Sequence, residues 1–173
     1  GPIFASIGKK PAGSARAAAS TAAQAAADPA TLQVPAGFKV ELLYTVPKAD
    51  QGSWVGITVD SKGRLITCDQ YGALYRITPP AIGGSPGETK IEKLSIDFGH
   101  CQGLLYHAGA LYGVVNDEAY QGRGLYRCKD TNGDDQFDAV ELLRAFPGKA
   151  GEHGPHGVIA SPDGKSLYVM CGN

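Results

Sequence analysis

The sequence predicts an all-β fold made of repeated units of short antiparallel strands. Glycine and proline account for 24 and 11 of the 173 residues, as expected where many strands are joined by tight turns. Short apolar runs bounded by turn residues recur, and aligning the second strand of each unit superimposes Leu65, Leu111 and Leu167. These leucines are 46 and 56 residues apart. A period of about 45 residues, with about four strands per unit, is typical of β-propeller blades.

Residues 1–30 differ from the rest of the chain and are interpreted as an alanine-rich leader. The run PAGSARAAASTAAQAAADPA has low complexity and offers no apolar face that would dock a helix onto a core. It lacks the apolar stretch of roughly 7–15 residues found in an intact secretory signal, although it can be the segment directly after such a signal. A β pattern begins at Leu32. In GFKVELLYTV the apolar Phe38, Val40 and Leu42 alternate with Lys39 and Glu41, which predicts a strand.

Two strand-turn-strand units and half of a third come next. Residues 56–78 read as three strands separated by turns, residues 103–128 repeat this order, and residues 157–173 repeat its first two strands. We therefore predict that residues 31–173 form about two and a half blades at the N-terminal end of a β-propeller. Propellers close with about 4–8 blades, so further sequence or another chain would complete the ring. A small open β-sheet domain that happens to repeat is the alternative.

Composition excludes several classes of function. The formal net charge is −1, from 16 Lys and Arg against 17 Asp and Glu, so the chain has no electrostatic footprint for nucleic acid. No apolar run approaches the roughly 18 residues of a membrane-spanning helix. The four cysteines form no CxxC pair and no CxxCH haem-attachment motif. They are either small buried apolar residues or one or two disulfides of an exported protein.

The acidic segment DTNGDDQFDAVE has the order of oxygen ligands found in a calcium-binding loop. Position 6, where the sharp turn favours glycine, is occupied by Asp135, and the flanking residues read as strands rather than as helices. An acidic surface turn is the alternative interpretation, because Asp and Asn favour turns. The candidate calcium ligands, with Gln136 contributing its backbone carbonyl, are Asp130, Asn132, Asp134, Gln136, Asp138 and Glu141.

Two histidines, His153 and His156, stand in a Gly-Pro bend just before the predicted first strand of the third blade. The ends of the inner strands form the ligand site of a propeller, where a histidine can act as a general base or bind a metal. The corresponding stretches of the first two blades contain Trp54, His100 and Gln102, so all five side chains are expected to converge near the axis. The alternative is a set of loop histidines that bond to backbone carbonyls.

The segment HGPHGVIASPDGKSLYVMCGN resembles the soluble glucose/sorbosone dehydrogenase family, six-bladed propellers that use pyrroloquinoline quinone (PQQ) and calcium. Over about five-sixths of its length the chain looks even more like the propeller of large secreted planctomycete proteins described as membrane-bound dehydrogenases or haem-binding proteins. The phrases that carry this likeness are GFKVELLYTVP, DQYGALYRITPP, QGLLY, GRGLYR with DTNGDD, and GEHGPHG.

The resemblance implies that His153 is the general base, which takes the proton of a substrate hydroxyl as hydride passes to the quinone. The sequence departs from the family where Pro155-His156 replaces two glycines. The arginines and the lysine that hold PQQ in the family would lie beyond Asn173. The cofactor-binding candidates within the chain are His100, Gln102, His156 and Trp54.

These observations predict part of a quinoprotein-dehydrogenase-like propeller that oxidises a sugar or an alcohol in the periplasm or outside the cell. PQQ and Ca²⁺ are the expected cofactors. The expected partners are the remaining blades and, by the resemblance, a cytochrome c domain or protein. The rival prediction is a non-catalytic propeller that acts as a binding or assembly module in a larger extracellular or electron-transfer complex.

Overall fold

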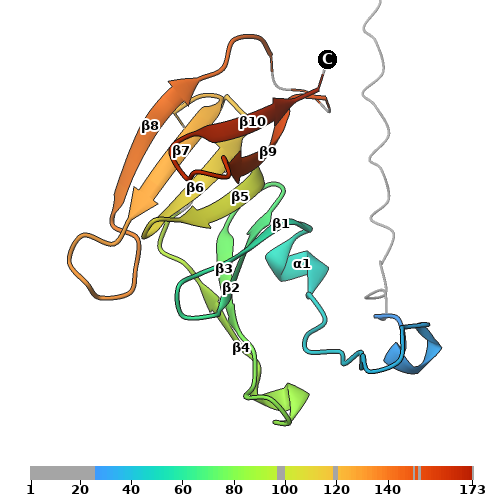
Figure 1. The fold of residues 1–173 in the computed structure, drawn as a ribbon. Helices are drawn as coiled ribbons and strands as arrows, with labels where there is room; N and C mark the ends of the chain where they lie inside the picture. The colour runs from blue at the N-terminus through green and yellow to red at the C-terminus, as the bar shows by residue number, and fades with distance from the viewer. Residues whose placement is uncertain (1–25, 97–99, 119–120, 150, 152, 173) are drawn as a thin grey trace, which may run out of the picture.

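The structure is a computed structural model that describes residues 26–96, 100–118, 121–149, 151 and 153–172. Within these ranges ten strands form three antiparallel sheets, as Figure 1 shows, so the predicted all-β class is confirmed. Residues 1–25, most of the predicted leader, lie outside the described residues. A 3₁₀ turn, η1 (Pro29–Thr31), spans the end of the leader, and the side chain of Asp28 caps it.

The first sheet is a meander of four strands in chain order. A short helix, α1 (Lys48–Gln51), leads into this sheet, and a 3₁₀ turn, η2 (Pro86–Glu88), precedes its last strand. The turn between the first two strands closes because the Asp60 carboxylate accepts hydrogen bonds from the backbone N–H groups of Lys62 and Arg64. The strands are β1 (Trp54–Val59), β2 (Leu65–Asp69), β3 (Leu74–Thr78) and β4 (Lys90–Lys93).

The second sheet repeats this meander, and the third repeats its first half. Leu65, Leu111 and Leu167 occupy equivalent pairing positions in the three sheets, so the repeat predicted from these leucines is present in the fold. The strands of the second sheet are β5 (Cys101–His107), β6 (Ala110–Val115), β7 (Gly124–Lys129) and β8 (Ala139–Ala145). Those of the third are β9 (Pro155–Ala160) and β10 (Leu167–Cys171).

Each sheet begins with a β-bulge at the same place in its first strand. The pairing of β1 with β2 skips Val55, that of β5 with β6 skips Gln102, and that of β9 with β10 skips His156. A glycine comes directly after each skipped residue. Because the extra residue of a bulge is unpaired and bends the strand, a bulge changes the direction of a side chain. Two of these bulged residues, Gln102 and His156, border the same cavity, which is described below.

The sheets stack through their first strands, since β5 contacts β1 on one side and β9 on the other. Glycine makes the approach possible: a Cβ on Gly103 would lie 1.8 Å from the carbonyl oxygen of His156. The main apolar core lies between the first and second sheets, and a smaller core lies between the second and third. Fully buried members of the main core include Ile66, Leu74, Leu111 and Tyr126, and the smaller core contains Val114, Leu125 and Val158.

The cysteines act as small apolar core residues in this fold. Cys68, Cys101 and Cys128 are buried in the main core, Cys171 is exposed, and all four thiols are free. The Cys68 thiol donates a hydrogen bond to the backbone carbonyl of Cys101 at 3.2 Å, which joins the first sheet to the second. Burial raises the pKa of the Cys128 thiol well above its usual range.

The strand predicted in GFKVELLYTV is wrong. Residues 32–47 contain no strand, and Phe38 is 73% exposed. An alternating pattern forms a strand only where a sheet edge accepts its N–H and C=O groups, and the described sheets pair with no strand in this segment.

The three sheets stand in a row and, within the described residues, do not close a ring. Apolar side chains remain exposed on the outer face of the first sheet, as at Ile57, and on the outer face of the third, as at Met170. No helix in the described ranges is long and apolar enough to cross a membrane.

Candidate functional site

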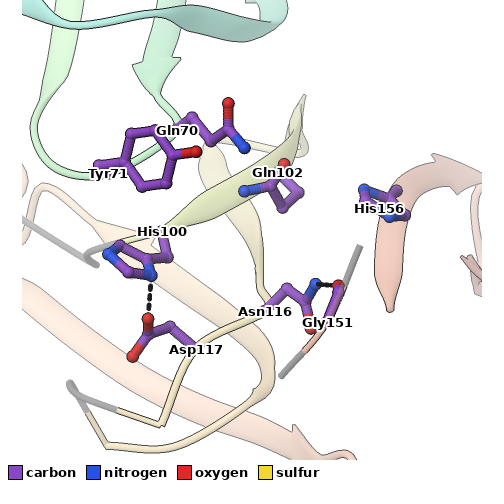
Figure 2. Close-up of a pocket in the computed structure, with 8 residues that line it drawn as sticks. All are labelled: Gln70, Tyr71, His100, Gln102, Asn116, Asp117, Gly151 and His156. Carbon is purple, nitrogen blue, oxygen red and sulfur yellow. Dashed lines mark hydrogen bonds and ion pairs between the residues drawn. The ribbon is translucent and has the colours of Figure 1, made fainter. Parts of the chain in front are cut away.

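An open cavity of about 620 Å³ lies where the first strands of the sheets begin and the second strands end (Figure 2). Its lining comes from segments of all three sheets. The lining residues are Gln70 and Tyr71 after β2, His100 and Gln102 at the start of β5, Asn116 and Asp117 after β6, and Gly151 and His156 around the start of β9.

Equivalent positions of successive sheets supply much of this lining. Gln102 and His156 are the bulged residues of β5 and β9, and Gln70 and Asn116 each come directly after the last residue of a second strand. The repeat thus gathers three amide side chains and an imidazole around one space. Amide groups both donate and accept hydrogen bonds, so this lining suits a neutral polar ligand.

His100 pairs with a carboxylate at the edge of the cavity. Its Nδ1 contacts the carboxylate of Asp117, and its imidazole meets the ring of Tyr71 edge-on at a centroid distance of 5.5 Å (Figure 2). The backbone of His100 has a φ of 32°, and its carbonyl accepts a hydrogen bond from the backbone N–H of Asn116 at 3.2 Å. Positive φ is uncommon for a residue other than glycine and is frequent at ligand sites.

This pairing defines what the imidazole can do. With Nδ1–H directed at the carboxylate, neutral His100 carries its lone pair on Nε2. A ligand hydroxyl next to Nε2 can transfer its proton there, and Asp117 stabilises the imidazolium that forms. The side chain of His100 is 37% exposed and that of Asp117 is 16% exposed, so the imidazole is accessible while its partner is largely enclosed.

Asn116 connects the cavity to the segment that enters the third sheet. Its side-chain Nδ2 donates to the carbonyl of Gly151 at 2.5 Å, and its Oδ1 accepts from Nε of Arg123 at 3.1 Å. Its backbone N–H also bonds to the carbonyl of His100. Asn116 is 9% exposed, and both polar atoms of its side chain are bonded to other parts of the protein. These hydrogen bonds hold the second and third sheets in position around the cavity.

The structure brings together three of the five side chains expected to converge. His100, Gln102 and His156 line the cavity, whereas His153 lines a second cavity. Trp54 is absent from the described lining of both. Its ring stacks between two tyrosines, and its Nε1 donates to a backbone carbonyl of helix α1. The physical reason is the bulge, because Trp54 precedes the bulged position instead of occupying it.

Sequence reasoning missed five lining residues, namely Gln70, Tyr71, Asn116, Asp117 and Gly151. For the first four the signal was present in the repeat. Gln70 and Tyr71 come after β2, and Asn116 and Asp117 come after β6 at the corresponding positions. In an antiparallel pair the end of the second strand lies beside the start of the first, so polar residues at both places share one edge of the sheet.

The predicted calcium ligands lie in the connection between β7 and β8, except Glu141, which belongs to β8 and pairs with Arg127. The loop oxygens mainly bond to the loop itself. Asp130 accepts hydrogen bonds from the backbone N–H groups of Gly133 and Asp135. Asn132 and Asp134 each accept one from the residue two positions on, and Asp138 accepts two from Thr131, which lower the pKa of that carboxyl. Gln136 donates from its side chain to Glu92.

No group of three His, Cys, Asp or Glu side chains arranged to hold a metal occurs in the part of the chain that the structure describes. Calcium binding at the loop therefore stays a prediction of the sequence.

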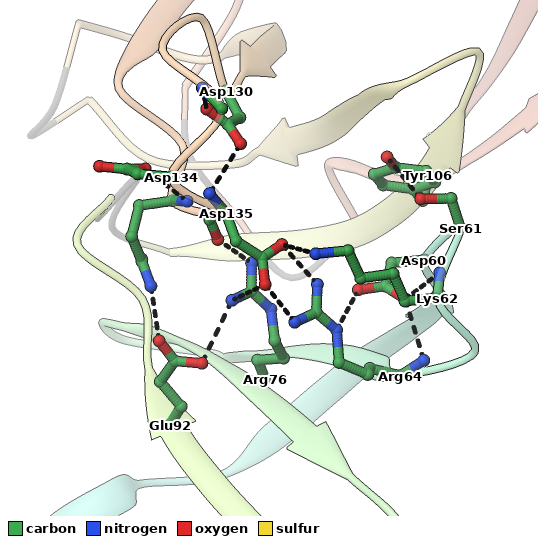
Figure 3. Close-up of polar contacts among 12 residues, drawn as sticks. Asp60, Ser61, Lys62, Arg64, Arg76, Glu92, Tyr106, Asp130, Asp134 and Asp135 are labelled. Atoms are coloured by element: carbon green, nitrogen blue, oxygen red, sulfur yellow. Dashed lines mark hydrogen bonds and ion pairs between the residues drawn. The ribbon is translucent and has the colours of Figure 1, made fainter.

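Asp135 joins this loop to the first sheet (Figure 3). Its φ of 71° is the left-handed conformation for which glycine was expected at this position. Its carboxylate accepts two hydrogen bonds from Arg64, at 2.5 and 2.7 Å, and forms an ion pair with Lys62 at 3.0 Å. Its carbonyl accepts a hydrogen bond from Arg76. The Arg64 guanidinium holds the pKa of Asp135 well below its usual range, and Asp135 in turn raises the pKa of Arg64.

The chemistry of the first cavity can be compared with that of PQQ. PQQ is a polycarboxylate, and buried carboxylates are bound by arginine, lysine or backbone N–H groups. Among the described lining residues there is no arginine or lysine, and Asp117 adds a negative charge. These residues do not fit PQQ, whereas they fit a neutral ligand that carries several hydroxyl groups.

Neither a protein-family model nor a curated protein matches the chain.

Proposed function

We propose that the three sheets are successive blades of a β-propeller, of the six-bladed type by resemblance. Three observations support this. The first strands β1, β5 and β9 stack on one another, and each sheet has its bulge at the same position. Ile57 and Met170, on the two outermost faces, are 62% and 63% exposed, as expected where further blades would cover them.

We also propose that the first cavity binds a small polyhydroxylated ligand, a sugar or an alcohol, and that His100 is its general base. The contact between His100 Nδ1 and the Asp117 carboxylate is the observation that carries this proposal. In the oxidation of a hydroxyl group, the proton would pass to the base and the hydride would pass to an electron acceptor. The resembling family uses PQQ for this purpose, which the described lining does not fit. An acceptor of that kind would need cationic residues from outside the described lining.

The assignment to His100 differs from the one that the resemblance implies, which is His153. His100 is favoured because it has an orienting carboxylate in a cavity with hydrogen-bonding side chains, whereas His153 borders a cavity whose described lining contains no carboxylate. The location in the periplasm or outside the cell, and a cytochrome c as redox partner, rest on the resemblance alone.

An activity assay separates these assignments. The chain, within its complete protein, would be supplied with PQQ, Ca²⁺ and an artificial electron-accepting dye, and then with glucose and a panel of simple alcohols. His100→Gln and Asp117→Asn should each lower dye reduction at least about 100-fold, because a positioned general base contributes roughly that much. His153→Gln should stay within about threefold of wild type. Loss of activity in His153→Gln with full activity in His100→Gln would overturn the assignment.

A non-catalytic binding module is the second candidate, and the lack of arginine and lysine in the described lining favours it. This candidate predicts that glucose or a related polyol binds to the cavity, as measured by calorimetry, without any dye reduction. Gln102→Ala should then weaken binding, since Gln102 projects from a bulge into the cavity, and His153→Gln should leave it unchanged. Dye reduction that depends on His100 would exclude this candidate.

A further inference from the structure

A second cavity, of about 500 Å³, lies beside the first and differs from it in charge. It is bordered by the start of β7, the segment after β8 and the start of β9. Gly151 lines both cavities, and Asn116, which lines the first, holds Arg123, which lines the second. The two spaces are therefore neighbours separated by the Asn116 side chain and its hydrogen bonds.

Arg123 is a buried cation in the wall of this second cavity. It is 8% exposed. Its Nε donates to Oδ1 of Asn116 at 3.1 Å, and its Nη1 donates to the carbonyl of Pro147 at 2.9 Å. Both acceptors are neutral, and within the described ranges no carboxylate forms an ion pair with Arg123. A guanidinium stays charged in proteins, so its burial costs free energy unless an anion lies nearby.

Two further basic side chains line this cavity. Lys149 and His153 line the same cavity, and none of its described lining residues is Asp or Glu. By contrast, Arg64 and Arg76 are each paired with carboxylates at the other end of the sheets. Arg123 is thus a nearly buried arginine whose described partners leave its charge uncompensated.

The rest of the wall is apolar. Phe146, Pro147 and Pro155 contribute ring surfaces, so the cavity offers an apolar space next to a fork-shaped cation. The planar guanidinium matches a carboxylate, which can accept two parallel N–H bonds from it. We propose that the second cavity binds a small organic carboxylate whose apolar body packs against Phe146 and the two prolines.

This site is independent of the proposed function, since the residues that carry that function line the other cavity. If the sugar site fails its test, the anion site can still be correct, and the reverse also holds.

Calorimetry with benzoate and benzyl alcohol tests the proposal, because these two probes share an apolar ring and differ in charge. Benzoate should bind at least about tenfold more tightly than benzyl alcohol. Rising salt concentration should weaken the binding of benzoate and leave the binding of benzyl alcohol unchanged. Lys149→Gln and Arg123→Gln should each lower the affinity for benzoate at least about fivefold. The matched control is Arg144→Gln, which removes an exposed arginine of β8 outside the cavity and should leave binding unchanged.

Equal affinity for the two probes, or no benzoate binding by the wild-type chain, would overturn the proposal. Arg123 also supports Asn116, so its variant needs a circular dichroism spectrum that matches wild type. If that variant unfolds, Lys149→Gln and the salt dependence still decide, because Lys149 is exposed and its loss does not disturb the fold.

Discussion

At the end of the sheets where the first strands begin, His100 and Asp117 border an open cavity. At the other end, Asp135 pairs with Arg64 and Lys62 and bonds to Arg76 through its backbone carbonyl. We call these the cavity end and the charged end. Both contain a carboxylate paired with a basic side chain. At the charged end that pair bridges two sheets and borders a small cavity of about 50 Å³, whereas at the cavity end it borders a space of about 620 Å³.

In this chain the most motif-like segment and the large polar cavity lie at opposite ends of the sheets, so the motif alone would not have located the cavity. The loop 130–138 carries the most conspicuous motif in the sequence, yet its oxygens mostly bond to its own backbone, and Asp135 bonds to the first sheet. The cavity end carries no familiar motif. Its polar side chains come from single residues that the repeat brings together, and they line the cavity of about 620 Å³.

The largest expected effect is a loss of stability at the cavity end. Gly103→Ala should destabilise the fold by about 3 kcal/mol or more, because the new Cβ would meet the His156 carbonyl oxygen at 1.8 Å and push the second and third sheets apart. Denaturant unfolding measures this loss. Gly56→Ala should cost less, since its Cβ would meet Cys68 Sγ at 3.1 Å, and Gly87→Ala should cost very little. Equal costs at Gly103 and Gly87 would contradict the stacking of β5 on β9.

The next largest effect is a loss of stability at the charged end. Asp135→Asn should destabilise the fold by about 1–2 kcal/mol, because Arg64 and Arg76 lose a negative partner while they stay largely buried. The figure is below that of a fully buried pair because Asp135 is 37% exposed. Glu141→Gln, which removes the exposed pair with Arg127, is the matched control and should leave stability nearly unchanged. Ligand binding at the cavity end should be unchanged in both variants.

The same carboxylate gives the charged end a pH dependence. The folded pKa of Asp135 is lowered, so its stabilisation is fully present above its unfolded pKa of about 3.9 and is lost as pH falls towards the folded pKa. Unfolding experiments between about pH 5 and pH 2 should therefore show a shallower acid dependence in Asp135→Asn than in the wild type. If the free energy of unfolding changes with pH equally in the variant and the wild type, Arg64 does not pair with this carboxylate in solution.

The smallest expected effect concerns calcium. If the loop binds Ca²⁺ as its sequence predicts, EDTA should lower the Tm by a few degrees and added Ca²⁺ should restore it, since a ligand that binds only the folded state stabilises it. Asp134→Asn should remove this response and leave the metal-free Tm nearly unchanged, because the side chain of Asp134 is exposed. A Tm that is insensitive to EDTA would leave the loop as a turn held by its own hydrogen bonds.

Much of the fold could be predicted from the sequence, because turns and alternating apolar residues are local signals. The alignment of Leu65, Leu111 and Leu167 predicts the repeat, and the two segments that flank the acidic loop, predicted as strands, are β7 and β8. The site was predictable where the repeat places a bulge before a glycine, as at Gln102 and His156. The pairing of His100 with Asp117, and of Arg64 with Asp135, joins residues 17 and 71 apart in the sequence, and no periodicity reports such contacts.

The role of His100 in the cavity can be tested most directly by NMR of the histidine ring nitrogens during a glucose titration. In the ligand-free protein, His100 should carry its proton on Nδ1, and its Nε2 signal should shift as glucose is added. Asp117→Asn should remove both features. The ring signals of His153 should not respond to glucose. A shift confined to His153, or no shift in any histidine at saturating glucose, would contradict the assignment of the ligand site to the cavity of His100.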